Sequence, residues 1–140
     1  INNIINNKMI NQNLLLIITL IIIFDYIWII KIQKNNWDNQ IFVIQNSKPK
    51  YNFKSAILTY FIMAICIYEL SIKRVNKNNI LHDSIKYGFF VGLAMYGIFN
   101  GTNYSIFKNY KLKTAIYDTL WGIFLSISIT FIISKHIYNT

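Results

Sequence analysis

The chain has 140 residues, of which 54% are hydrophobic and 16% aromatic, and it carries a formal net charge of +9. It is too apolar for a typical soluble domain and too short for two domains, so residues 1–140 are predicted to form a single membrane domain. One proline, five glycines and one cysteine exclude a collagen-like chain, an intrachain disulfide and a cysteine-based zinc site.

Four apolar stretches can be recognised, at about 14–32, 55–72, 84–102 and 114–133. Each has about 18–20 residues, enough for a helix to cross a hydrocarbon layer of about 30 Å. The sequence therefore predicts an all-α integral membrane bundle of four transmembrane helices. A signal peptide is the alternative for the first stretch, but this stretch contains Asp25 and lacks a basic leading region and a small-residue cleavage site.

Most of the basic residues lie between the apolar stretches, where long side chains can reach lipid phosphates. The predicted partners are therefore membrane lipids, with anionic head groups at the basic loops, and nucleic acid is not predicted. The first and third loops share one side of the membrane and carry the larger share of lysine, which predicts that both termini lie outside. The basic residues of the three loops are Lys31, Lys34, Lys48, Lys50, Lys54, Lys73, Arg74, Lys77, Lys108, Lys111 and Lys113.

The first loop is the longest and has helical spacing at Trp37, Ile41 and Ile44. This spacing is typical of an amphipathic helix lying at the membrane interface. A short strand or an irregular loop remains an equal alternative, because Phe42 widens the apolar face. Pro49 is expected to end the segment.

Polar side chains inside apolar stretches are costly and are therefore candidate functional residues. The expected topology places Asp25, Asn100, Asn103 and Asp118 in the same half of the bilayer. Tyr96 shares a helical face with the two asparagines through i, i+4, i+7 spacing.

Glu69 falls in the opposite half, one turn before Lys73. We expect it to form an i, i+4 ion pair with that lysine.

Two acidic residues precede a tryptophan by three positions, as Asp25 and Trp28 and as Asp118 and Trp121. Each acid shares a helical face with its indole, which can donate to a carboxylate. Such a cluster could share a proton, hold a hard cation or bind a polar substrate. The interpretation we favour is that the carboxylates are hydrogen-bonding groups that join the helices.

The third stretch contains two pairs of glycines at i, i+4 spacing, on roughly opposite faces. Paired small residues allow apolar helices to approach closely, so this stretch is predicted to lie at the centre of the bundle. The glycines predicted to mediate helix packing are Gly88, Gly92, Gly97, Gly101 and Gly122.

No catalytic residue, metal ligand or cofactor is predicted. His82 and His136 lie in or next to polar segments, and Cys66 has no histidine at helical spacing. The sequence contains no phosphate-binding glycine loop. A metal-dependent lipid-processing enzyme that uses the acidic cluster is the remaining catalytic alternative.

Three motifs resemble a family of small predicted membrane proteins from bacteria and giant viruses, catalogued as domain of unknown function 2177. They are Asp25 with Trp28, the segment 96–103 and the segment 118–122, and the resemblance extends over about residues 14–133. The chain departs from the third-span motif at Asn100 and Gly101, where the family has aspartate and leucine. The resemblance implies a four-span membrane protein and implies no activity.

The favoured function is that of a non-catalytic structural component, packed with other protein subunits in a larger membrane assembly. A giant-virus internal membrane, a capsid-membrane layer and an organellar membrane complex are examples of such an assembly. The alternative is a protein that binds or transports a small polar solute or ion at the Asp25, Asn100, Asn103 and Asp118 cluster.

Overall fold

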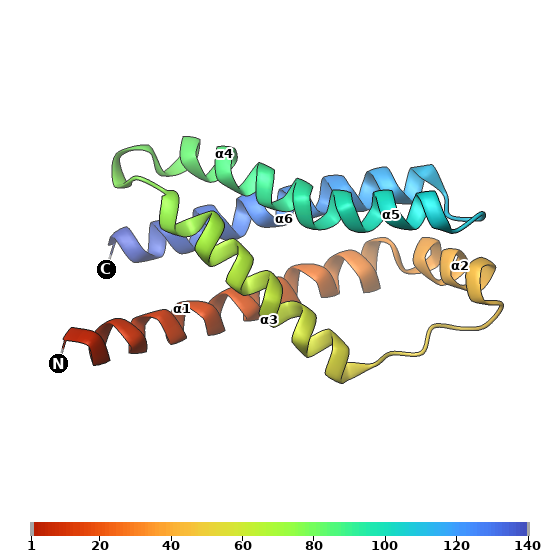
Figure 1. Ribbon diagram of the computed structural model, residues 1–140, viewed down its shortest axis with the longest axis horizontal. Coiled ribbons are helices and arrows are strands. Elements are labelled where there is room, and N and C mark those ends of the chain that lie inside the picture. Colours follow the sequence, from red (N-terminus) through yellow and green to blue (C-terminus); the bar gives the residue numbers. More distant parts are fainter. Residues whose placement is uncertain (1, 140) are drawn as a thin grey trace.

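The computed structural model describes residues 2–139, and it describes side chains from residue 11 onward. The described chain is helical with short connections (Figure 1). Three of its helices are long and apolar enough to cross a membrane, Asn11–Ile32, Phe53–Arg74 and Leu112–Asn139. The elements in chain order are α1 (Asn2–Asp25), η1 (Tyr26–Ile32), α2 (Lys34–Gln45), α3 (Phe53–Leu70), η2 (Ile72–Arg74), η3 (Lys77–Asn79), α4 (Ile80–Gly92), η4 (Leu93–Gly97), α5 (Ile98–Ile106) and α6 (Leu112–Asn139).

The third predicted stretch forms a continuous helical run from α4 through η4 to α5. The middle segment, η4, is a π-helix, which divides the run into two shorter α-helices. The start of α1, the end of α6 and the turn between α3 and α4 lie at one end of the molecule (Figure 1). The other end holds α2 and the connection from α5 to α6.

Helices α4 and α6 pack closely through small residues that recur every fourth position. A Cβ atom added at Gly88 would lie 2.6 Å from the Cα atom of Ile127, and one added at Gly92 would lie 2.5 Å from the carbonyl oxygen of Gly122. Backbones this close leave no space for a larger side chain. The small residues of this seam are Ser84, Gly88 and Gly92 on α4 and Gly122, Ser126, Thr130 and Ser134 on α6.

The centre of the bundle is α6, which corrects the prediction for the third apolar stretch. Helix α6 contacts α1, α3, α4 and α5. The run from α4 to α5 has only one closely packed glycine face, because a Cβ atom at Gly101 would meet no atom within 4 Å and one at Gly97 would come no closer than 3.3 Å, to a Leu93 side chain. The predicted packing role of Gly101 is therefore wrong. Gly122 does lie in a close contact, where a side chain would overlap the Tyr96 ring.

Helix α3 crosses the others obliquely and contacts α1 (Figure 1). Ala64 and Ile67 in its second half are fully buried, as are Ile17 and Ile21 of α1. The first half of α3 is far more exposed. The oblique crossing therefore seals one end of the bundle and leaves the other end open between α3 and its neighbours.

The first loop forms a helix, α2, which is one of the alternatives that the sequence left open. Gln40 anchors this helix: its amide nitrogen donates to the carbonyl of Asn109 at 2.9 Å, and its amide oxygen accepts from the backbone N–H of Lys111 at 3.0 Å. Because Gln40 is only 1% exposed, these bonds replace the water that a buried amide would lose. They fix α2 against the turn before α6.

The ion pair predicted between Glu69 and Lys73 is confirmed, with the Lys73 Nζ atom 2.8 Å from a Glu69 carboxylate oxygen. Both side chains are about half exposed, so the pair contributes little to stability.

We expect Gly92→Ala to lower the free energy of unfolding by about 1–3 kcal/mol, because the added methyl group would overlap the α6 backbone. Gly101→Ala is the matched control, and it should leave stability unchanged or raise it by up to about 1 kcal/mol through helix propensity. Unfolding in mixed micelles with increasing dodecyl sulfate, followed by tryptophan fluorescence, measures both. Equal effects of the two substitutions would contradict the assigned α4–α6 contact.

Candidate functional site

Two aspartates and two tryptophans form reciprocal pairs between the first and last long helices. The Trp28 indole donates to Asp118 Oδ1 at 3.4 Å, and the Trp121 indole donates to Asp25 Oδ1 at 3.0 Å. The two indole rings stack with their centroids 4.7 Å apart and their planes 2° from parallel. Asp25 is 5% exposed and Asp118 is 7% exposed, so both carboxylates depend on these protein donors.

The shared-face spacing did not indicate which carboxylate each indole would serve, and in the structure each indole serves the carboxylate of the other helix. The reason is the antiparallel direction of the two helices. In both helices the tryptophan follows its aspartate by three residues along the chain. Because the helices run in opposite directions, the two aspartates lie at different heights along the bundle. Asp25 is thereby level with Trp121, and Trp28 is level with Asp118. Two motifs with the same spacing of aspartate and tryptophan thus form two reciprocal hydrogen bonds.

Asn100 extends this cluster toward the turn between α5 and α6. Its amide nitrogen donates to Asp118 Oδ2 at 2.8 Å and to the carbonyl of Tyr96 at 2.9 Å, and its amide oxygen accepts from the Tyr110 hydroxyl at 2.7 Å. Burial, assisted by the charge of Asp118, raises the pKa of Tyr110 to about 12. The phenol therefore stays protonated at neutral pH and can remain a donor.

Both π-helical segments lie at this cluster. Trp28 belongs to η1, which starts directly after Asp25, and Tyr96 belongs to η4. A π-helical turn has one more residue than an α-helical turn, which changes the direction of its side chains and backbone carbonyls. The Tyr96 carbonyl uses this geometry to accept from Asn100 and, at 3.5 Å, from the Thr119 hydroxyl. Single π turns are frequent at functional sites.

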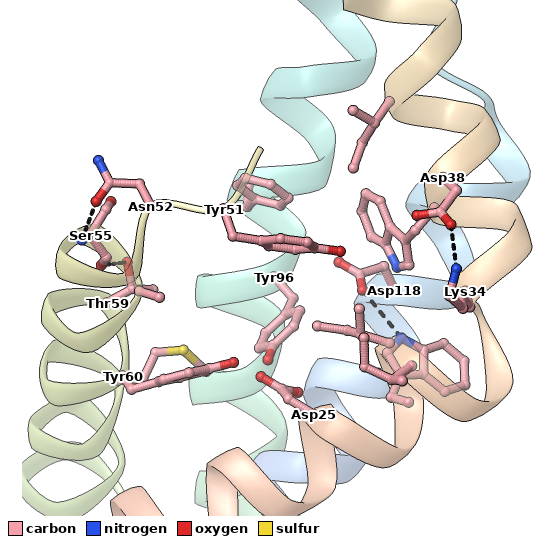
Figure 2. Close-up of a pocket in the computed structure, with 18 of the residues that line it drawn as sticks. Asp25, Lys34, Asp38, Tyr51, Asn52, Ser55, Thr59, Tyr60, Tyr96 and Asp118 are labelled. Carbon is pink, nitrogen blue, oxygen red and sulfur yellow. Dashed lines mark hydrogen bonds and ion pairs between the residues drawn. The ribbon is translucent and has the colours of Figure 1, made fainter. Parts of the chain in front are cut away.

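A cavity of about 580 Å³ opens beside the cluster, between the first half of α3 and the helices that carry the aspartates. Figure 2 shows the Tyr60 and Tyr96 hydroxyls pointing toward the Asp25 carboxylate from opposite helices. The lining is mostly apolar and aromatic, with a few ionisable groups. It comprises Asp25, Trp28, Ile29, Ile30, Lys34, Trp37, Asp38, Ile41, Lys50, Tyr51, Asn52, Ser55, Ala56, Thr59, Tyr60, Met63, Met95, Tyr96, Phe99 and Asp118.

This lining has the chemistry of a small-molecule site, in which apolar walls surround a few fixed polar groups. Among the described residues, no group of three or more His, Cys, Asp and Glu side chains is placed to hold a metal ion. The two aspartates supply negative charge, and the tyrosine hydroxyls supply donors and acceptors. The arrangement can therefore bind and orient a polar or charged group.

The structure brings six of the seven predicted cluster residues together: Asp25, Trp28, Tyr96, Asn100, Asp118 and Trp121. Asn103 lies farther along α5, half-buried, and is linked to the cluster through Tyr110, which its side chain contacts and whose hydroxyl donates to Asn100.

Sequence reasoning missed three groups at this site: Tyr110, Tyr60 and the α2 residues that line the cavity. Tyr60 could have been found, because Ala56, Tyr60 and Met63 share one face of α3 by i, i+4, i+7 spacing. Nothing in the sequence indicates that Tyr110 would turn back toward Asn100.

Comparison with known families decides the classification. A family model described as "Predicted membrane protein (DUF2177)" matches residues 10–134. The chain belongs to the DUF2177 family. The match covers every residue of the Asp–Trp cluster and of the cavity, and it agrees with the three helices that are apolar enough to span. This DUF2177 chain is a membrane protein on both grounds.

No curated protein and no solved structure matches this DUF2177 chain significantly.

Proposed function

We propose that this DUF2177 protein is a non-catalytic, four-span membrane protein that binds a small ligand in the cavity beside Asp25 and Asp118. The cavity is the observation that carries this proposal. Its volume of about 580 Å³ lies within the range of about 300–1,000 Å³ usual for ligand pockets. Because of this cavity, we favour ligand binding over a purely structural function. Ligand binding is the second of the two functions expected from the sequence.

A fourth span over Ile80–Ile106 is supported by the length and packing of this run. Its three segments have 13, 5 and 9 residues, which corresponds to a length of about 40 Å at about 1.5 Å per residue. The run also packs along α6, which is itself a candidate span. A helix that lies alongside a spanning neighbour crosses the same layer.

Cysteine labelling tests the fourth span. In a Cys66→Ser background, we expect single cysteines at Lys77 and Lys108 to react with a membrane-impermeant maleimide from opposite faces of sealed vesicles. A cysteine at Lys50 is the control, since it should label from the same face as Lys108. Labelling of Lys77 and Lys108 from one face would contradict the fourth span.

A cavity-filling substitution tests ligand binding. Ala56 lines the cavity, so Ala56→Phe should displace a bound molecule, whereas Ala94→Phe adds the same ring at an exposed position outside it. We expect mass spectrometry of the protein extracted in polymer nanodiscs to detect a retained molecule. Its amount should fall about tenfold or more in Ala56→Phe, equivalent to a loss of at least about 1.4 kcal/mol. Unchanged retention in Ala56→Phe would contradict the proposal.

A structural function in a larger membrane assembly is the second candidate. The hydrogen bonds that Asp25 and Asp118 accept from donors of the same chain favour this function, because carboxylates that join helices in a membrane need such donors. Large apolar side chains such as Phe90 and Ile98 are also exposed on the α4–α5 run. They need either lipid or a protein neighbour. A stoichiometric protein partner in the same mass spectra would favour this function, in a virion or organellar membrane.

A further inference from the structure

The cavity is acidic although the chain is strongly basic. The sequence has five Asp and Glu residues and fourteen Lys and Arg residues. Three of the acidic residues line the cavity, against two lysines. One of these lysines, Lys34, already forms an ion pair with Asp38 at 2.8 Å. Beyond this pair, Asp25 and Asp118 remain against the single positive charge of Lys50, which leaves an excess of one negative charge.

These two carboxylates line one cavity, and each accepts from one of two indoles that stack on each other. In a medium of low dielectric constant, like charges repel strongly, and either a shared proton or a cation beside them relieves this repulsion. Each carboxylate has an indole donor, but an indole N–H supplies no positive charge. A cationic group in the adjoining cavity would offset the repulsion.

The cavity walls suit an organic cation better than a metal ion. Hard cations need about six or more oxygen ligands, whereas the cavity walls include Ile29, Ile30, Met63 and Met95. Aromatic faces attract an ammonium group within about 6 Å, and the attraction is stronger when the contact is desolvated. The aromatic residues of the lining are Trp28, Trp37, Tyr51, Tyr60, Tyr96 and Phe99.

We infer that the cavity binds an alkylammonium group, with Asp25 and Asp118 supplying the counter-charge and the aromatic side chains enclosing its alkyl substituents. This inference rests on the proposed function, because it names the ligand class of the same cavity. An anionic ligand would be repelled by the two carboxylates, and a neutral ligand would supply no counter-charge to them.

The ammonium group could be carried by a lipid headgroup or by a free amine, since the recognised chemistry is the same. A second, apolar cavity of about 310 Å³ lies between α1 and α3, and Tyr60 lines both cavities. An acyl chain fits such a cavity. Lys50, the second lysine of the lining, suits the phosphate that adjoins the ammonium of a lipid headgroup.

Intrinsic fluorescence can report binding, because two of the three tryptophans line the cavity and the third stacks on one of them. The protein is placed in phosphatidylglycerol nanodiscs, which contain no ammonium group. It is then titrated with choline and with 3,3-dimethylbutan-1-ol, a neutral molecule of the same shape. We expect choline to bind about tenfold or more tightly than the alcohol, because only choline engages the carboxylates.

Charge-removing variants test the assigned residues. Asp25→Asn and Asp118→Asn should each weaken choline binding about tenfold or more while leaving the affinity for the alcohol unchanged. Glu69→Gln removes the same charge from the opposite end of α3, outside the cavity, and should bind choline as the wild type does. If one aspartate variant fails to fold, the other variant and the comparison of choline with the alcohol still test whether the cavity binds an alkylammonium group.

Phosphatidylcholine nanodiscs identify the source of the ammonium. If a lipid headgroup fills the cavity, the starting fluorescence there should equal that of choline-saturated protein, and added choline should change nothing. Equal choline affinity in both kinds of disc indicates a free amine. Either result supports the inference.

Two results would overturn the alkylammonium assignment. One is equal binding of choline and the alcohol, with both abolished by Ala56→Phe, which would leave the proposed ligand-binding function intact. The other is no response to choline in phosphatidylglycerol discs together with an unaltered starting signal in phosphatidylcholine discs. The proposed function itself fails only if Ala56→Phe also leaves the co-purifying molecules unchanged.

Discussion

The reciprocal Asp–Trp contact is the interaction on which the arrangement of this bundle depends. Buried carboxylates in an apolar layer need partners, and here each partner comes from the opposite helix. The contact can form only when η1 and α6 are antiparallel and in one register, since a shift of one turn would separate both pairs. Two hydrogen bonds and one stacked ring pair therefore fix the relative direction of η1 and α6, their relative height along the bundle and their rotation about their own axes.

The remaining contacts follow from this register. Within a membrane, helices gain little from hydrophobic burial and associate through close packing and hydrogen bonds. The small-residue seam supplies close packing on the α4 side of α6, while Asn100 ties α5 to Asp118. In the first half of α3, the hydrogen bonds of Ser55 and Thr59 stay within that helix and its N-cap, and α3 diverges there (Figure 1). This divergence leaves the cavity, and Asp25 and Asp118 lie at its wall (Figure 2).

Sequence reasoning succeeded where the length of apolar stretches and the energetic cost of burying charge determine the structure. Apolar length located the long helices, and the rule that intramembrane charges need partners located Asp25 and Asp118. It failed where the answer depends on three-dimensional proximity. The exchange of indole donors between helices requires knowing which helices are neighbours, and Gly101 has the same spacing signal as Gly92 but faces no helix. Tyr110 and Gln40 act across connections that no periodic pattern describes.

Circular dichroism of the indole band in the far ultraviolet tests the stacked Asp–Trp contact most directly. The transition dipoles of indoles stacked 4.7 Å apart should couple and give a signal that belongs to both rings. Trp28→Phe and Trp121→Phe should each abolish the whole signal, whereas Trp37→Phe should leave it in place. If Trp28→Phe and Trp121→Phe each subtract only an independent contribution, the two rings are not in contact and the reciprocal arrangement is wrong.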